Sequence, residues 1–376
     1  MVSVFAPATL AGLRLQSRFV RSATAERMRV DTPDDGQRLG QFYAALAKGG
    51  VGLIVTGHIT VDPSGRVGTT MPGLYSDGQI EGWRAAAGVV HDAGGLLCAQ
   101  INHGGGRAKP ESGALEAGLF AGPVCVSPLP SGEPSSQRAK DPMAGEPLTP
   151  DGIEKLIAAY AAAAVRARQA GLDAVQIHAA HGYLGSQFLS PSTNHRQDEW
   201  GGSLEGRARF LRRVVQAVRE AVGGGFPVGM KLGAMDSDQQ QGLRLDDSLQ
   251  AAQWFEQDGL DFIEISGAFH AGVAERKIRP GKGEAYYLPA ARKFKERLTI
   301  PVISVGGYRS LAVIEEALNS GGGDFIAMSR PLIRQPNLPH VLREGGQSEC
   351  LSCNLCLLTR DGATRCHAKD RQAVSR

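Results

Sequence analysis

The sequence contains no apolar run that approaches the ~18 residues needed to span a membrane. Its first 18 residues lack a basic segment followed by an apolar core, so we expect no secretory signal and a cytoplasmic protein. Basic residues are scattered, with no cluster of five or more, and the net charge is only +3. Neither nucleic acid nor a membrane surface is therefore an expected partner.

What the sequence does have is an alternation of strands and helices. The chain has 376 residues, of which 42% are hydrophobic and 21% charged, as in ordinary globular proteins. Short apolar, β-rich runs recur eight times, separated by segments with helical patterning. The runs span 18–23, 51–57, 96–104, 174–180, 227–233, 262–267, 301–307 and 324–329. This pattern indicates a parallel sheet covered by helices, and eight such units predict a single (β/α)8 barrel.

The alternative is a doubly wound open sheet, but no Gly-x-Gly-x-x-Gly follows the first strand. Thr149, Ser203 and Ser248 are candidate helix caps, each before a helical pattern. The connection over 105–148 is rich in Gly, Pro and Ser, which indicates a lid or binding cap. We divide the chain into a barrel domain over 1–340, with an N-terminal hairpin, and a cysteine-rich extension over 341–376.

Polar residues at the C-terminal ends of barrel strands normally line the active site. Gly306, Gly307 and Arg330 follow the last two strands and are typical of a phosphate site; turn glycines and a surface arginine are the alternative. Lys231 lies in an apolar strand, so it should face an anion or pair with an aspartate inside the barrel. Gln100 can bond both donors and acceptors of a heterocycle. Together these residues predict a phosphorylated heterocyclic cofactor.

Two histidines, His178 and His181, stand just before Tyr183 where another strand ends. Three interpretations are open: metal ligands, a packed structural pair, or donors to a substrate. A metal site needs at least three ligands, and no acidic motif nearby supplies the third. In the following loop, Asn194, Arg196 and Asp198 are expected to pin the chain through hydrogen bonds.

Several segments resemble the Old Yellow Enzyme family of flavin mononucleotide oxidoreductases and cover nearly the whole barrel. They are LQSRFVRSATAE, GGVGLIVTGHITVDPSGR, AQINHGGGRA, HAAHGYLGSQFLSPSTNHRQDEWGGSLEGRARF, SVGGYRS and FIAMSRPLIRQPNLP. The resemblance implies bound FMN, NADH or NADPH as a transient hydride donor, and a homo-oligomer.

The resemblance also implies a role for individual residues. Those beside the flavin would be Ser22, Ala23, Thr24 and Ala25 along the ring, Gly57 and Gln100 at its pyrimidine side, Lys231 near N1 and O2, and Gly306, Gly307, Ser329 and Arg330 at the phosphate. His178 and His181 match the pair that binds the substrate's carbonyl oxygen, and Tyr183 matches the proton donor.

The implied reaction passes hydride from the nicotinamide to flavin N5 and then to the β-carbon of an alkene conjugated to a carbonyl or nitro group. Two imidazole donors would stabilise the negative charge that develops on the substrate oxygen. A tyrosine, with an ordinary pKa of about 10, can protonate the α-carbon. We therefore expect an enone, enoyl compound or nitroalkene as substrate. The alternatives are amine oxidation or demethylation on the same scaffold, a metal-dependent barrel hydrolase, and a flavin carrier without enzymatic activity.

Three residues depart from the family's pattern. Ala25 stands where many relatives have Thr or Cys, which puts the flavin potential and substrate range in doubt. Arg27 stands where some have Tyr and would favour an anionic substrate or form a surface salt bridge. Ser329 replaces the usual Gly, and its hydroxyl would add a phosphate contact.

Four of the six cysteines crowd into the last 27 residues, as Cys350-x2-Cys353-x2-Cys356-x9-Cys366. This density is typical of a four-iron cluster or zinc rather than disulfides, with a site that holds no metal as the alternative. The arrangement resembles that of trimethylamine dehydrogenase and dienoyl-CoA reductase, although the last spacing is shorter here. That resemblance implies a cluster that relays electrons to or from the flavin. If a cluster is present, we expect a separate electron-carrier protein as partner.

Overall fold

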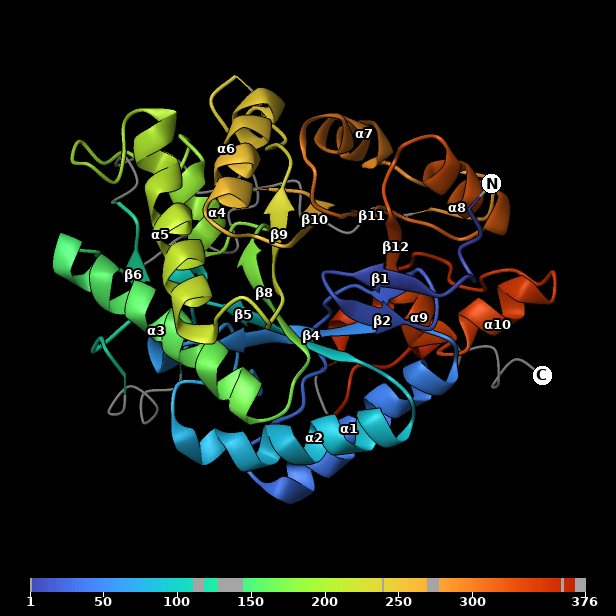
Figure 1. Cartoon of the computed structure of the whole chain (residues 1–376). Coiled ribbons are helices and arrows are strands. Elements are labelled where there is room, and N and C mark those ends of the chain that lie inside the picture. The colour runs from blue at the N-terminus through green and yellow to red at the C-terminus, as the bar shows by residue number, and fades with distance from the viewer. Residues whose placement is uncertain are drawn as a thin grey trace.

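The computed structural model describes residues 2–110, 118–127, 145–238, 240–268, 277–359 and 362–368. Eight parallel strands in these residues close into one barrel (Figure 1). The barrel strands are β3 (Phe19–Arg21), β4 (Leu53–Thr60), β5 (Leu97–Asn102), β8 (Ala174–Ala179), β9 (Val228–Gly233), β10 (Phe262–Ser266), β11 (Val302–Val305) and β12 (Phe325–Met328). Each overlaps one of the eight predicted runs, so the (β/α)8 prediction is confirmed.

Helices surround the strands, as Figure 1 shows. They are α1 (Pro33–Lys48), α2 (Ile80–Asp92), α3 (Pro150–Gln169), α4 (Leu184–Leu189), α5 (Leu204–Val222), α6 (Leu245–Gln257), α7 (Leu288–Arg297), α8 (Leu311–Asn319), α9 (Arg330–Arg334) and α10 (Leu338–Arg343). Within the described residues, no helix is both long and apolar enough to cross a bilayer.

Two of the three predicted helix caps are confirmed. The side chain of Thr149 accepts from the Gly152 backbone at the start of α3, and that of Ser203 accepts from Gly206 at the start of α5. The prediction for Ser248 is wrong, because α6 begins three residues earlier, at Leu245. Two acidic residues in its first turn favour the earlier start, and Ser248 is buried inside the helix with its hydroxyl directed at the Gly233 carbonyl.

The predicted lid over 105–148 falls partly outside the described residues. The described part contains a short parallel pair, β6 (Val124–Cys125) with β7 (Glu146–Pro147). Arg196 donates to two carbonyls of this region, at Val126 (2.8 Å) and Leu148 (2.6 Å), and it also pairs with Asp198. Asn194 donates to the Phe188 carbonyl of α4 (2.7 Å) and to the Trp200 carbonyl at the other end of the loop (2.8 Å). The prediction that these residues pin the loop is confirmed.

The barrel interior is filled at one end by an apolar core that includes the N-terminal hairpin. The hairpin joins β1 (Ala8–Leu10) to β2 (Leu13–Leu15), and its turn places Ala11 and Gly12 at φ 48° and 87°. Such left-handed turns match the twist of hairpin strands. The hairpin side chains pack on inward-facing strand residues; this inner core comprises Leu10, Leu15, Val20, Leu53, Val55, Cys98, Ala174, Phe262, Ile303, Phe325 and Ala327.

Truncating a buried side chain of the hairpin should therefore lower the free energy of unfolding. Leu10 is fully buried in the inner core, so we expect Leu10→Ala to lower the free energy of unfolding by about 2–5 kcal/mol, measured by urea denaturation. Thr9→Ala, at the exposed neighbouring position on the same strand, is the matched control and should change it by no more than about 0.5 kcal/mol. Equal effects of the two substitutions would show that the hairpin does not close the barrel.

Candidate active site at the barrel mouth

A layer of polar side chains lies inside the barrel next to the inner core. Gln100 on β5, Gln176 on β8, Lys231 on β9 and Glu264 on β10 are each at most 2% exposed. Strand register places Gln100 opposite Gln176, and Lys231 opposite Glu264. Three of the four lie two positions beyond an inner-core residue of the same strand, so they face the barrel interior.

Hydrogen bonds connect this layer into one network. Gln100 Nε2 donates to Gln176 Oε1 (2.7 Å), and Gln176 Nε2 donates to Glu264 Oε2 (3.1 Å). Lys231 Nζ donates to Glu264 Oε1 (2.8 Å) and to Ser22 Oγ (2.6 Å). The Ser22 hydroxyl in turn donates to Glu264 Oε1 (2.6 Å). Lys231 thus has a protein carboxylate as its partner, and that carboxylate is a glutamate instead of the aspartate considered from the sequence.

Glu264 and Gln176 were missed by the sequence analysis. The signal for both was present, because FIEIS and AVQIH each place a polar side chain in the middle of an apolar strand. The same signal singled out Lys231 in VGMKLG. Applied to every strand, it would have singled out all four residues of the layer, whereas their pairing follows from the strand register.

The structure brings the two predicted histidines and Tyr183 together at the end of β8. The ring of His178 lies 5.1 Å from the ring of His181 and 5.1 Å from that of Tyr183, edge-on to both. His181 and Gly182 have φ of 61° and 74°, so the chain turns sharply just after the strand. A histidine rarely adopts a positive φ, so neighbouring contacts must stabilise this conformation. One such contact is the hydrogen bond from Arg107 Nη1 to the His181 carbonyl (2.6 Å).

Hydrogen bonds define the proton positions on both imidazoles. His178 Nδ1 accepts from the Ala180 backbone (3.2 Å), so the neutral ring carries its proton on Nε2. That Nε2 lies 3.3 Å from His181 Nδ1, and His181 Nε2 lies 2.8 Å from Ser266 Oγ. Because the Nε2–H of His178 donates to Nδ1 of His181, the neutral His181 ring carries its proton on Nε2. Both rings therefore have an Nε2–H to donate, and in this structure each is directed at a protein atom.

His58 and Ser266 also belong to this cluster and were not predicted. The ring of His58, on strand β4, lies 5.3 Å from the ring of Tyr183, which follows β8. Its Nδ1 is 3.3 Å from Asn102 Nδ2. Ser266 ends β10 and contacts His181 as described. Their positions at the C-terminal ends of strands were the available signal.

Burial lowers the pKa of all three histidines. Desolvation, followed by the charge of Lys231, lowers the pKa of His181 from 6.5 to about 3. Desolvation alone lowers that of His58 to about 4, and desolvation with the neighbouring His181 lowers that of His178 well below its usual value. The cluster is therefore neutral near pH 7, and it donates hydrogen bonds without carrying charge.

The segment after β3 runs along the other side of the mouth. Ala23 and Thr24 are half-buried and Ala25 is exposed. Thr24 Oγ1 donates to the Ser22 carbonyl (3.0 Å) and bonds the Ser329 hydroxyl (2.7 Å). The Ser329 hydroxyl is thus held by Thr24, whereas the sequence suggested a phosphate contact for it.

Gly57 lies against the same segment. Its backbone N–H donates to Glu26 Oε1 (2.8 Å), and Glu26 pairs with the buried Arg21 (2.7 Å). A Cβ at Gly57 would come within 2.2 Å of Glu26 Oε2, so only glycine fits there. Arg27 donates to the Leu357 carbonyl of the C-terminal extension (3.1 Å), in place of the predicted substrate or salt-bridge contact.

The predicted phosphate residues lie at the ends of β11 and β12. Gly306 and Gly307 have φ of 140° and 85°, which glycine adopts readily, and Arg330 is 7% exposed at the start of α9. The Arg330 guanidinium donates to Asn354 Oδ1 (2.5 Å). Just before α8, Glu284 accepts from the Ser310 backbone N–H (2.9 Å) and from the Ser310 hydroxyl (2.7 Å), so a carboxylate already lies beside this helix start. A cation and an amide in the mouth, with glycines and a buried arginine at one side, form a donor set that fits FMN.

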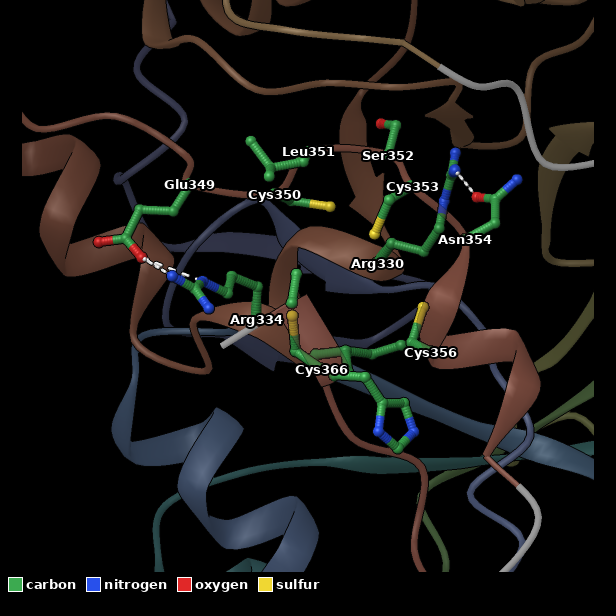
Figure 2. A pocket seen from close by; sticks show the side chains of 13 residues that line it. Arg330, Arg334, Glu349, Cys350, Leu351, Ser352, Cys353, Asn354, Cys356 and Cys366 are labelled. Atoms are coloured by element: carbon green, nitrogen blue, oxygen red, sulfur yellow. Dashed lines mark hydrogen bonds and ion pairs between the residues drawn. The ribbon is translucent and has the colours of Figure 1, made fainter. Parts of the chain in front are cut away.

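The four extension cysteines line one hollow beside Arg330. Figure 2 shows their sulfurs around this space. Arg334 and Asn354 also line it. Among the residues that the structure describes, no three Cys, His, Asp or Glu side chains are grouped closely enough to hold a metal ion as they stand. Burial, followed by the neighbouring Cys350, raises the pKa of the Cys356 thiol to about 11.

Several contacts fix the extension to the barrel mouth. Arg309, which is 1% exposed, donates to Ser352 Oγ (2.9 Å) and approaches Cys350 Sγ (3.7 Å). The Thr364 backbone donates to the Glu26 carbonyl (2.8 Å), and its hydroxyl donates to the Ala25 carbonyl (2.7 Å). The extension therefore contacts Ala25, the last residue of the 22–25 segment that the resemblance places beside the flavin.

Comparison with known proteins gives a match over nearly the whole barrel. A model of the "NADH:flavin oxidoreductase / NADH oxidase family" matches residues 3–349. NADH oxidase from Thermoanaerobacter brockii is 33% identical over 358 residues, which are 94% of this chain and 53% of that protein. The chain thus spans about half the length of that relative. 4,4'-Dithiodibutanoate disulfide reductase from Rhodococcus erythropolis is 33% identical over 99% of this chain and 96% of its own.

Solved structures agree with the fold. The 2-naphthoyl-CoA reductase complex with 2-naphthoyl-CoA aligns with a TM-score of 0.80 at 27% identity, over 94% of this chain and 54% of that one. The Old Yellow Enzyme homologue from Zymomonas mobilis aligns with a TM-score of 0.74 at 27% identity, over 92% and 93% of the two chains. The predicted resemblance is confirmed at the level of the family.

The neutral histidines should make stability depend on pH. His181 binds a proton in the unfolded chain below about pH 6.5 but in the folded protein only near pH 3, so the free energy of unfolding should fall as pH is lowered between these values. His181→Gln should flatten this slope in urea denaturation between pH 7 and 4. His340→Gln, at an exposed ring on α10, is the control and should keep the wild-type slope. A His181→Gln slope equal to that of wild type would contradict the buried neutral state.

Proposed function

The chain belongs to the NADH:flavin oxidoreductase / NADH oxidase family, whose members use flavin and NAD(P)H, and on that premise we propose that it reduces an alkene conjugated to a carbonyl or nitro group. The substrate would be an enone, an enoyl compound or a nitroalkene. The observation that carries this proposal is the contact of His178 with both His181 and Tyr183 at the barrel mouth.

The two imidazoles fit the stabilisation of an oxyanion. Both are neutral donors, with His178 buried and His181 half-buried, and a hydrogen bond to developing charge is stronger in such a desolvated site than in water. In this structure the Nε2–H groups are used by His181 and Ser266, so a substrate oxygen would bind by replacing one or both contacts. When bound, FMN supplies the hydride that it receives from NADH or NADPH.

Tyr183 is proposed as the proton donor. Its ring lies 5.1 Å from that of His178 and 5.3 Å from that of His58, so the phenol is next to an oxygen-binding donor. Proton transfer from the hydroxyl to the substrate's α-carbon would complete the reduction. Lys231 and Gln100 would contact the flavin from the buried network behind this cluster.

Amine oxidation or demethylation is the runner-up on the same scaffold. It would develop positive charge on the substrate nitrogen, which paired imidazole donors do not stabilise. The arrangement of His178 and His181 thus favours reduction. Family membership gives no support to the metal-dependent hydrolase considered from the sequence.

Replacing Tyr183 tests the proposal directly. Tyr183→Phe should slow the oxidative half-reaction with an enone by roughly 100-fold or more, because the proton donor is lost, while leaving reduction by NAD(P)H unchanged. Anaerobic stopped-flow measurement of flavin absorbance separates the two half-reactions.

Tyr160→Phe, at a buried tyrosine on α3 outside the barrel, is the matched control and should leave both rates unchanged. Equal losses in both half-reactions of Tyr183→Phe would count against a proton donor. Oxidation of amines in preference to reduction of enones, nitroalkenes or enoyl thioesters would instead support the runner-up.

We further propose that Cys350, Cys353, Cys356 and Cys366 hold a four-iron cluster that exchanges electrons with the flavin. Support comes from the four thiols and from their shared hollow beside Arg330. Since the sulfurs are not grouped for a metal as they stand, binding would draw them together and deprotonate them. A separate electron-carrier protein would then be a partner.

Iron and acid-labile sulfide assays test this second proposal on protein purified without oxygen. We expect about four iron and four sulfide per chain, and loss of both in Cys356→Ser. Cys125→Ser, at a buried cysteine outside the extension, should keep the wild-type content. Protein that contains bound flavin but neither iron nor sulfide would end the cluster proposal and leave the reductase proposal standing.

A further inference from the structure

A buried carboxylate is paired with the cation expected beside the flavin. Glu264 is fully buried and Lys231 is 2% exposed, and their charged atoms lie 2.8 Å apart. Register fixes the pair, because the two residues are directly opposite on the neighbouring strands β9 and β10. The contact is thus built into the barrel wall and does not depend on a flexible loop.

The carboxylate is held by three donors. Its Oε1 accepts from Lys231 and Ser22, and its Oε2 accepts from Gln176. A group that only accepts is an ionised carboxylate. In the described part of the chain, these bonds use two of the three N–H groups of the Lys231 ammonium, counting the one to Ser22 Oγ. The third can point to a ligand in the mouth.

The pair as a whole carries no net charge, and burial removes the water that would screen it. A lone ammonium at this position would strongly stabilise negative charge on a nearby ligand, whereas an ammonium 2.8 Å from a carboxylate does so much less. Reduction of a flavin adds negative charge at its N1 and O2 edge. The charge of Glu264 therefore opposes flavin reduction at the same place where Lys231 favours it.

We propose that Glu264 holds the reduction potential of the bound flavin low by neutralising Lys231 in the barrel wall. Glu264 acts through Lys231, so it is a positioning residue and not a catalytic one. The inference rests on the proposed placement of Lys231 beside the flavin ring. A lower potential makes the reduced flavin a stronger hydride donor, which suits alkenes that are only weakly activated.

Spectroelectrochemical titration of the FMN-loaded protein tests this inference without measuring turnover. Glu264→Gln keeps the shape and leaves Lys231 unpaired, so the midpoint potential should shift to a more positive value. The double variant Glu264→Gln with Lys231→Met removes both charges, and its potential should fall back towards that of wild type. Glu154→Gln, which removes a carboxylate from an exposed ion pair with Arg213 between α3 and α5, is the control and should leave the potential at the wild-type value.

Removing one partner of a buried ion pair is strongly destabilising. If Glu264→Gln does not fold with FMN, Glu264→Ala replaces it, because water in the vacated space can solvate the ammonium. For Glu264→Gln and for Glu264→Ala we expect the same shift of the flavin midpoint potential to a more positive value.

The outcomes distinguish failure of this inference from failure of the proposal that Lys231 lies beside the flavin. A positive shift that the double variant reverses supports the role of Glu264. A positive shift that the double variant keeps overturns it, because the effect would not run through Lys231. Unchanged potentials in all variants also overturn it, and they show in addition that Lys231 does not lie beside the flavin. The Tyr183 half-reactions are independent of all three results.

Discussion

Closure of eight strands into one barrel is the constraint on which the site depends. Because the closed barrel packs the inward-facing side chains of neighbouring strands against one another, a buried polar residue on one strand must find its partner on a neighbour. The apolar end is closed by Leu10 and Leu15 of the hairpin. The next layer is polar, and register alone places Gln100 opposite Gln176 and Lys231 opposite Glu264. The network at the mouth is a consequence of strand pairing.

Much of this arrangement could be predicted from the sequence. Apolar runs located all eight barrel strands, and Thr149 and Ser203 marked two helix starts, because these signals are local. Local signals failed at Ser248, because α6 begins three residues earlier and the acidic residues just before Ser248 form part of its first turn. Partners that are distant in the sequence also could not be predicted. The burial of Lys231 indicated an anionic partner, but only the strand register identifies that partner as Glu264. His58 joins Tyr183 from another strand for the same reason.

The histidine cluster shows how burial prepares donors for a neutral reaction site. A protonated imidazole near Lys231 would add charge to a buried region that already contains an ammonium. The protein instead keeps both rings neutral and orders their protons through the Ala180 backbone and Ser266. This arrangement requires a left-handed backbone at His181, which raises the energy of the folded state. The hydrogen bond from Arg107 to the His181 carbonyl stabilises that conformation. Removal of Ser266 would free the His181 tautomer without changing its charge.

The cysteine extension contacts both sides of the predicted flavin site. At one side Asn354 accepts from Arg330, the predicted phosphate ligand. At the other, Thr364 donates to the carbonyl of Ala25, which is predicted beside the ring, and to that of Glu26, which follows it. Glu26 also accepts from the Gly57 backbone, so a displacement of Thr364 reaches the barrel strand β4 through one residue. Buried polar contacts of this kind resist small shifts because each broken bond leaves an unsatisfied group. Any change that draws the four cysteines together therefore acts on residues at the mouth, whether a metal or another reaction causes it.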